Sequence, residues 1–228
     1  MTRCWPILLL AVVAAWGLGQ AGSADEGSKP PELFEIKKQL RAYYTGGDYQ
    51  TAFTKVVEEA KTYLQERGPA KDKQAVVFDI DETTLSNAPY IEGVLLADVT
   101  QFTMPTTSSR PFQMKAEDKA LPTLELYKLA RKLGYRTYFI TGRGDTKELR
   151  AATEKNLRDV GYAGYEKLYM RPTDYKEDTV VPYKSGRREE IEKSGAKIVL
   201  NIGDQWSDLK GGFAEKTFKL PNPFYFIP

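Results

Sequence analysis

From residue 74 onward, short apolar runs alternate with longer stretches that carry apolar residues at helical spacing. The runs with strand character lie at 75–80, 137–140, 167–170, 198–202 and, more weakly, 217–220. The helix-like stretches lie near 118–133, 145–160, 184–194 and 205–214. This order predicts an α/β fold, a doubly wound, Rossmann-like parallel sheet flanked by helices on both faces.

Two further segments accompany this core, which we assign to residues 71–228. Residues 32–70 contain two amphipathic stretches separated by Gly46-Gly47, and they predict an N-terminal helical hairpin that packs on the core. Residues from about 85 to 117 interrupt the alternation with several prolines and aromatic residues. They predict a small cap-like insertion beside the carboxyl end of the first strand.

The N-terminus has the composition of a signal peptide. Arg3 is followed by an apolar run at 7–18 and by the small residues Gly22-Ser23-Ala24, so we expect cleavage to remove residues 1–24. Residues 25–31 then form a flexible lead-in. An uncleaved membrane anchor is the alternative, which the short apolar run disfavours. We therefore expect an exported protein, periplasmic or secreted, with no stable membrane insertion after cleavage.

The residue types that the chain lacks limit the catalytic mechanisms it could use. The chain has no His, and its only Cys is Cys4, which lies in the predicted signal peptide. This excludes His-ligated zinc hydrolases, phosphohistidine phosphatases, Ser-His-Asp triads and thiol nucleophiles. The formal net charge of +2 gives no field that would attract nucleic acid, so we expect no nucleic-acid partner. The oligomeric state stays open.

Polar side chains gather where the predicted strands end. The first run is followed by Asp79, Asp81 and Thr83, the second by Thr141, Gly142 and Arg143, and the fourth by Asp204 and Asp208, while Lys184 opens the helix after the third. The carboxyl ends of parallel strands meet at one edge, where ligands bind. Converging carboxylates repel one another unless a cation joins them, and Mg²⁺ suits a site of oxygen ligands best.

Each of these residues also has an ordinary structural interpretation. An Asp after a strand is usually a turn residue or a helix cap. Thr141-Gly142 could form a simple turn, and Lys184 could be a solvated charge. Each feature alone would favour the structural interpretation, whereas their joint occurrence in this order favours a site.

The Asp-x-Asp-x-Thr run that begins at Asp79, the later Thr141 and Lys184, and the Gly-Asp-x-x-x-Asp element that ends at Asp208 resemble the haloacid dehalogenase (HAD) superfamily. Residues 78–87 and the ending from 211 to 228 are similar to its subfamily IIIB. This acid phosphatase branch includes class B-type acid phosphatases and plant vegetative storage proteins.

The resemblance implies a role for each residue. Asp79 would be the nucleophile and a metal ligand, Asp81 the general acid and base that gives the metal its backbone carbonyl, Thr141 and Lys184 the phosphoryl-binding groups, Asp204 a direct Mg²⁺ ligand, and Asp208 a ligand directly or through water. We also expect Thr83, Gly142 and Arg143 to contact the phosphate or the substrate. Nearby anions should favour protonated Asp81, although Mg²⁺ and Lys184 act against this.

The sequence therefore predicts an exported, Mg²⁺-dependent acid phosphatase that hydrolyses small phosphomonoesters through a phosphoryl-aspartate on Asp79. Nucleotides and aryl phosphates are candidate substrates, because Trp206 and the insertion residues Tyr90, Phe102 and Phe112 could stack on such groups. Packing between the insertion and the core is a slightly favoured alternative for these aromatics. A non-catalytic storage or binding protein on the same fold and a phosphotransferase or mutase are the other functions considered, and the intact Asp79 argues against the first.

Overall fold

The computed structural model describes residues 31–96 and 117–228. The predicted signal peptide, the lead-in except for residue 31, and the middle of the insertion with Phe102 and Phe112 lie outside these residues. Leu33–Pro228 forms one unit. Within the described residues, no helix combines the length and apolar character needed to cross a membrane.

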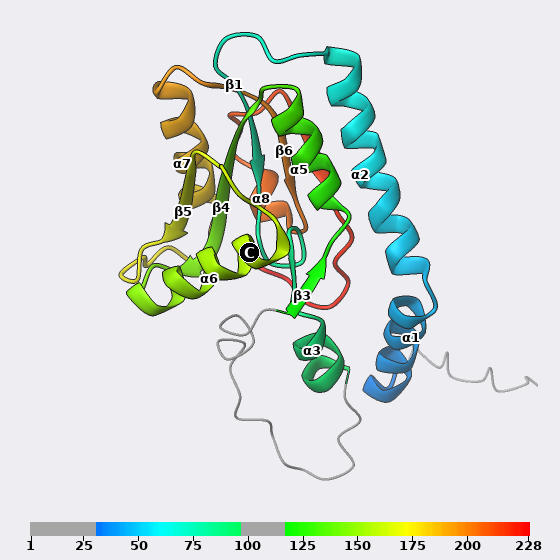
Figure 1. The fold of residues 1–228 in the computed structure, drawn as a ribbon. Helices are drawn as coiled ribbons and strands as arrows, with labels where there is room; N and C mark the ends of the chain where they lie inside the picture. The colour runs from blue at the N-terminus through cyan, green and yellow to red at the C-terminus, as the bar shows by residue number, and fades with distance from the viewer. Residues whose placement is uncertain (1–30, 97–116) are drawn as a thin grey trace, which may run out of the picture. The chain divides into compact units, whose positions relative to one another are not determined.

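A five-stranded parallel sheet forms the centre of this unit (Figure 1). Its strands are β1 (Gln74–Phe78), β4 (Arg136–Gly144), β5 (Lys167–Arg171), β6 (Lys197–Gly203) and β7 (Lys216–Lys219), in the order β5-β4-β1-β6-β7. The predicted α/β architecture is confirmed. The first strand of the sequence lies in the middle of the sheet, so the residues that follow it reach the centre of its carboxyl edge.

The sheet is buried on both faces. Val76 and Phe78 contribute to a core that helices α2 (Asp48–Arg67), α5 (Thr123–Lys132) and α6 (Lys147–Val160) cover. Ala75 and Val77 belong to a second core, to which helix α7 (Val181–Lys193) contributes. Successive side chains of a strand point to opposite faces, so a near-continuous apolar run is what this arrangement requires.

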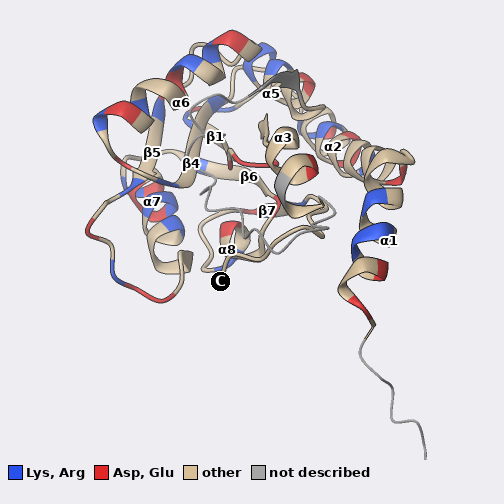
Figure 2. Ribbon diagram, turned by 90° about the horizontal axis from the view of Figure 1, so that it is seen from below, with Lys and Arg blue, Asp and Glu red and all other residues tan. Residues whose placement is uncertain are grey.

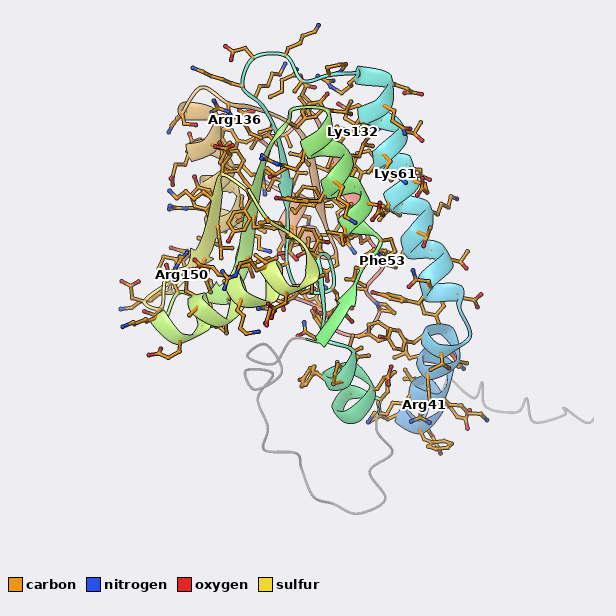
Figure 3. The ribbon with its side chains drawn as sticks, in the orientation of Figure 1. Arg41, Phe53, Lys61, Lys132, Arg136 and Arg150 are labelled. Carbon is orange, nitrogen blue, oxygen red and sulfur yellow. The ribbon has the colours of Figure 1, made fainter. Side chains whose placement is uncertain are left out.

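The N-terminal hairpin consists of α1 (Leu33–Thr45) and α2. Gly47, with a φ of 96°, lies in the left-handed region between them, where a side chain would be strained. The side chain of Phe53 is buried between α2 and the core (Figure 3). α2 contacts both α5 and β7, so the hairpin extends the helical layer on one face of the sheet.

Two predicted helices differ from the structure. The stretch 118–133 begins as strand β3 (Glu117–Ala120), which pairs antiparallel with β2 (Leu85–Ser86), and α5 starts only after Pro122, because proline disfavours helix in the residue before it. The stretch 205–214 contains only the short helix α8 (Trp206–Leu209), because Gly211 and Gly212 adopt positive φ. The described part of the insertion adds α3 (Ala88–Tyr90) and the π-helical turn η1 (Ile91–Leu95).

Candidate active site

The predicted site residues meet at the carboxyl edge of the sheet. Asp79 directly follows β1, Thr141 lies near the end of β4, and Asp204 directly follows β6. Lys184 lies in the first turn of α7. Figure 2 views the molecule from this edge, with acidic segments drawn red after β1 and on α8.

The loop after β1 turns tightly around one carbonyl. The oxygen of Ile80 accepts hydrogen bonds from the backbone amides of Thr83, Thr84 and Leu85, at 3.2, 2.8 and 2.9 Å. Glu82 has a φ of 51°, a backbone conformation that costs a residue with a side chain about 1–3 kcal/mol. Asp79 and Asp81, which flank the start of this turn, line the same cavity.

Lys184 connects two of the carboxylates. Its Nζ donates to Asp79 Oδ1 at 2.6 Å and also to Asp208 Oδ1, and all three side chains are at least nine-tenths buried. Oxygens of Asp79, Asp204 and Asp208 lie within 4.8 Å of one another. The edge of the sheet therefore holds a buried group of three carboxylates, which we call the acidic triad.

The acidic triad carries more negative charge than Lys184 can balance. Burial and the nearby Asp208 raise the pKa of Asp79 well above its usual range, although Lys184 opposes the shift. The same two causes raise the pKa of Asp204 to about 7. Three carboxylates and one ammonium leave two negative charges, which a bound divalent cation would neutralise. The donors are all oxygens, so the triad fits a hard cation.

Neighbouring groups fix the outer two carboxylates. Asp204 accepts from Thr83 Oγ1 at 3.2 Å, Gln205 Nε2 at 2.9 Å and Asn222 Nδ2 at 2.6 Å. Asp208 Oδ2 accepts from the backbone amide of Gln205 at 2.7 Å. The position of Asp208 also requires glycine at 203, since an added Cβ there would lie 2.5 Å from the Cβ of Asp208.

Asp81 lies outside the acidic triad and has its own cation. Arg143 Nε donates to both oxygens of Asp81, at 3.1 and 3.0 Å, and a second guanidinium nitrogen donates to Oδ1 at 2.6 Å. Asn87 Nδ2 adds a bond of 2.9 Å. Burial alone would raise the pKa of Asp81, but Arg143 and Asn87 outweigh it and lower the net pKa. This direction is opposite to the protonated Asp81 that the sequence suggested.

The predicted phosphate and substrate contacts occupy different positions. Asp79, Asp81, Gly142, Arg143 and Lys184 line a cavity of about 300 Å³, together with Asp204 and Asp208. Thr141 is buried, and its hydroxyl accepts from the backbone amide of Arg143. The Arg143 side chain is occupied by Asp81 and Thr153, and the Thr83 hydroxyl by Asp204. Their roles toward phosphate stay predictions.

Several residues around the site were not predicted. Glu82 is buried beside Asp81, where burial raises its pKa to about 7, and it accepts from Asn87 and from the Tyr225 hydroxyl. Tyr225 lies near the C-terminal end and lines the cavity that contains Asp79 and Asp81. No local motif identifies such partners, because a contact between residues far apart in the chain depends on the completed fold.

Comparisons with known proteins identify the family. Residues 30–228 match the model of the HAD superfamily, subfamily IIIB (Acid phosphatase). The chain belongs to this family. Acid phosphatase 1 of Solanum lycopersicum is 34% identical over 199 residues, which cover 85% of this chain and 75% of that protein. A stem 28 kDa glycoprotein of Glycine max is 38% identical, over 87% of this chain and 76% of that protein. Vegetative storage protein 1 of Arabidopsis thaliana is 36% identical, over 81% and 67%.

A solved structure supports the fold. The class C acid phosphatase from Bacillus anthracis, crystallised with tungstate, superimposes with a TM-score of 0.63 over 85% of this chain and 86% of that one, at 22% identity. The predicted family and fold class are thus confirmed. Family membership and the acid phosphatase relatives also confirm the predicted enzyme class, a phosphomonoester hydrolase.

Proposed function

We propose that this chain is an exported, Mg²⁺-dependent acid phosphatase that hydrolyses phosphomonoesters through a phosphoryl-aspartate on Asp79. The observation that supports this best is the acidic triad with Lys184, because it joins a candidate nucleophile, a cation and oxygen ligands in one buried cluster. The carboxylates of Asp79, Asp204 and Asp208 would hold Mg²⁺, with the backbone carbonyl of Asp81 as a further ligand. Bound Mg²⁺ would neutralise charge on the phosphate oxygens and let an anionic nucleophile approach.

In the first step, a carboxylate oxygen of Asp79 attacks phosphorus and the bond to the leaving oxygen breaks. Lys184 and Thr141 hold the transferring phosphoryl group, and Lys184 also neutralises Asp79 in the resting state. Asp81 gives its proton to the leaving oxygen. Because Arg143 lowers the pKa of Asp81, this step requires Asp81 to take up a proton first, which a lower pH favours.

In the second step, water attacks phosphorus and releases phosphate from Asp79. Asp81 accepts the proton of that water, and the hydrogen bonds from Arg143 and Asn87 suit its ionised form. One carboxylate thus serves as acid and then as base. A phosphatase assay with and without EDTA tests the metal requirement, and unchanged activity in metal-free buffer would contradict it.

Export is proposed from the order of Arg3, the apolar run and Gly22-Ser23-Ala24 at the N-terminus. The mature protein is expected to start after Ala24, in the periplasm or outside the cell. Mass spectrometry of the protein recovered from outside the cytoplasm tests this prediction. A chain that still begins at Met1, or one with lipid on Cys4, would refute it.

The substrate is proposed to be an aryl phosphate or a nucleotide, so that the leaving group is an aryl alcohol or a nucleoside. A second cavity of about 190 Å³ adjoins Asp81, and Tyr90, Leu95, Tyr225 and Ile227 line it. An apolar, aromatic wall beside the expected proton donor suits a planar group. Trp206 is instead exposed, with Lys219 over its ring. Rates for alkyl, aryl and nucleoside monophosphates with purified mature protein would test the preference.

A storage role without catalysis is the second candidate, because two relatives are called vegetative storage proteins. The acidic triad, Lys184 and Asp79 are nevertheless all in place. Turnover that EDTA abolishes and Mg²⁺ restores supports the enzyme. Stoichiometric binding of phosphate esters without turnover, at saturating Mg²⁺, would support storage or binding. Transfer of the phosphoryl group to an added alcohol instead of water would indicate a phosphotransferase.

A further inference from the structure

Arg188 is a buried arginine whose hydrogen-bond acceptors, in the described part of the chain, are all carbonyl oxygens. It lies on α7 with 1% of its surface exposed. Its Nε donates to the carbonyl of Gly212 at 2.8 Å, one terminal nitrogen donates to the carbonyl of Asp208 at 2.6 Å, and the other donates to the carbonyl of Lys210. No carboxylate forms an ion pair with it within the described residues.

The segment after α8 is shaped around this guanidinium. Gly211 has a φ of 88°, and a Cβ added there would lie 2.5 Å from the Cβ of Ser185 on α7. Gly212 also has a positive φ, of 80°. The chain therefore folds closely against α7 and turns the carbonyls of three alternate residues, Asp208, Lys210 and Gly212, toward one fork of donors. Arginine suits this arrangement because its planar fork offers several donors in fixed directions.

Arg188 lies one helical turn after Lys184, so both side chains project from the same side of α7. Both reach Asp208. Lys184 binds its carboxylate, and Arg188 binds its backbone carbonyl, which Asn201 Nδ2 also contacts at 2.9 Å. Helix α7 thus holds one member of the acidic triad at two points, by side chain and by backbone.

We infer that Arg188 is a positioning residue, which fixes the Asp208 segment so that the acidic triad keeps the spacing needed for a divalent cation. Arg188 need not touch substrate or metal, since it acts through the backbone of Asp208. The inference rests on the proposed function, because it concerns the geometry of that same site. Partners of metal ligands commonly change metal affinity or activity by about 10- to 100-fold when they are removed.

A structural role alone is the competing explanation, because three carbonyls lose their donors when Arg188 is removed. The two explanations predict that removal of Arg188 changes different measured quantities. A purely structural residue lowers the unfolding temperature and leaves the folded fraction with normal metal affinity and turnover. A positioning residue alters metal affinity and kcat in protein that remains folded, with little effect on KM.

The test uses R188A and R188K, with R187A as the matched control. Arg187 is the neighbouring residue on α7, and its partly exposed guanidinium pairs with Glu190. Cooperative unfolding establishes that each variant is folded. Mn²⁺ binding, followed by electron paramagnetic resonance, gives metal affinity without reference to turnover. Kinetics with a phosphomonoester give kcat and KM, and millimolar guanidinium is added to R188A against sodium at equal ionic strength.

For R188A we expect Mn²⁺ to bind about 10- to 100-fold more weakly. We expect kcat to fall on the order of a hundredfold, as for other small displacements of catalytic groups, and guanidinium to restore part of both losses. R187A should stay within about twofold of the wild type. Folded R188A that equals R187A in Mn²⁺ affinity and kcat would overturn the inference, and so would guanidinium that restores only the unfolding temperature.

If R188A does not fold, R188K decides, because an ammonium keeps the charge without the planar fork. Weakened Mn²⁺ binding in folded R188K supports the inference, and wild-type binding overturns it. Loss of folding in both variants also overturns it, since Arg188 would then serve the fold itself. A wild-type protein that binds Mn²⁺ without hydrolysing any phosphomonoester would contradict the proposed function, and the Mn²⁺ measurements would still test Arg188 separately.

Discussion

The negative charges on the two sides of the candidate active site are compensated to different extents. On one side, Asp81 is matched by Arg143 and Asn87, and its pKa is lowered. On the other side, Lys184 pairs with two of the three carboxylates of the acidic triad, and the pKa values of Asp79 and Asp204 are raised. Asp79 and Asp81 are two residues apart, so local sequence does not cause the difference. The charged groups that the fold brings to each carboxylate cause it: Asp208 lies beside Asp79 and raises its pKa, whereas Arg143 lies beside Asp81 and lowers its pKa.

The comparison distinguishes a charge pair that is complete without a ligand, Asp81 with Arg143, from a group of carboxylates that needs a bound cation, the acidic triad. A buried carboxylate with a bidentate arginine is stable without further charge. A buried group with two uncompensated charges is destabilising, unless a cation binds. We therefore interpret the Asp81 side as a preformed proton-transfer site and the acidic triad as a cation site. The predictions below test this division.

The largest effect is expected from Asp79→Asn, which removes the proposed nucleophile from the acidic triad. Turnover should fall at least about 10⁴-fold for every phosphomonoester, whatever its leaving group. Steady-state kinetics measure the loss, and the intact mass excludes deamidation back to Asp. D145N is the control, because Asp145 pairs with Arg150 near the surface. Activity of D79N within tenfold of D145N would refute a phosphoryl-Asp79 mechanism.

Asp81→Asn should have a smaller effect that depends on the leaving group. The variant keeps the nucleophile but has no proton to donate, so phosphoenzyme formation should slow about 10²- to 10⁴-fold for an alkyl phosphate. It should slow much less for p-nitrophenyl phosphate, whose leaving group departs as an anion. Rapid-quench kinetics on both substrates measure this step.

Hydrolysis of the phosphoenzyme, the second step, should also be slow in D81N, because the attacking water then lacks its general base. D81N is expected to accumulate phosphoryl-Asp79 and to release a burst of p-nitrophenolate before phosphate appears slowly. Mass spectrometry of the labelled peptide locates the phosphoryl group. Equal slowing of the first step for both leaving groups would show that Asp81 is not the acid. Phosphate on Thr141 or Ser207 would overturn the mechanism.

The sequence predicted which residues gather at the site but not how their charges are divided. Asp79, Asp204 and Lys184 each follow a strand or open a helix, so a parallel sheet is enough to bring them to one edge. The partner of Asp81 could not be predicted in this way. Arg143 comes 62 residues later and was predicted to bind phosphate, and only the completed fold shows that its side chain turns to Asp81.

Prediction of the fold has the same limit, because contacts between distant residues appear only in the completed structure. Buried strands were recognised because their apolar runs are nearly continuous, as both-sided burial requires. Strand β3 was predicted as part of a helix, because its pairing with β2 depends on a partner more than thirty residues away. Arg188 was missed as well. Its acceptors are backbone carbonyls, which leave no mark in the amino-acid sequence.

Arg143→Met should remove the cation that balances the charge of Asp81. It leaves Asp81, whose side chain is 19% exposed, without its cation, and we expect the free energy of unfolding at pH 7 to fall by about 3 kcal/mol. R150M is the control, because Arg150 on α6 (Figure 3) pairs with the partly exposed carboxylates of Asp145 and Glu154, and its loss should cost at most about 1 kcal/mol. Urea unfolding measures both.

The pH dependence sharpens the Arg143 prediction. The folded-state pKa of Asp81 is lowered, so the stability it contributes is present above its unfolded pKa and is lost as pH falls through the folded pKa. The difference between wild type and R143M should thus shrink below about pH 4, where Asp81 is protonated in unfolded chains. A difference that is independent of pH would mean that Arg143 acts only by packing.

The smallest effect, and the most direct test of the unbalanced side, is Asp204→Asn in metal-free protein. The folded-state pKa of Asp204 is raised to about 7. Folded protein therefore binds more protons than unfolded protein between about pH 4 and 7, and wild-type stability should fall as pH rises across that window. The neutral amide of the D204N variant would avoid this cost. The amide oxygen can accept from Gln205 and Asn222, and the amide nitrogen can donate to the Thr83 hydroxyl, so all three hydrogen bonds persist.

At pH 8 without metal, D204N should be about 2 kcal/mol more stable than wild type, with a flatter pH profile. Saturating Mg²⁺ should reverse the order, because only the wild type gains binding energy. Urea unfolding with EDTA and with Mg²⁺ measures both states. Parallel pH profiles for the two metal-free proteins would show that the acidic triad is already balanced without a cation.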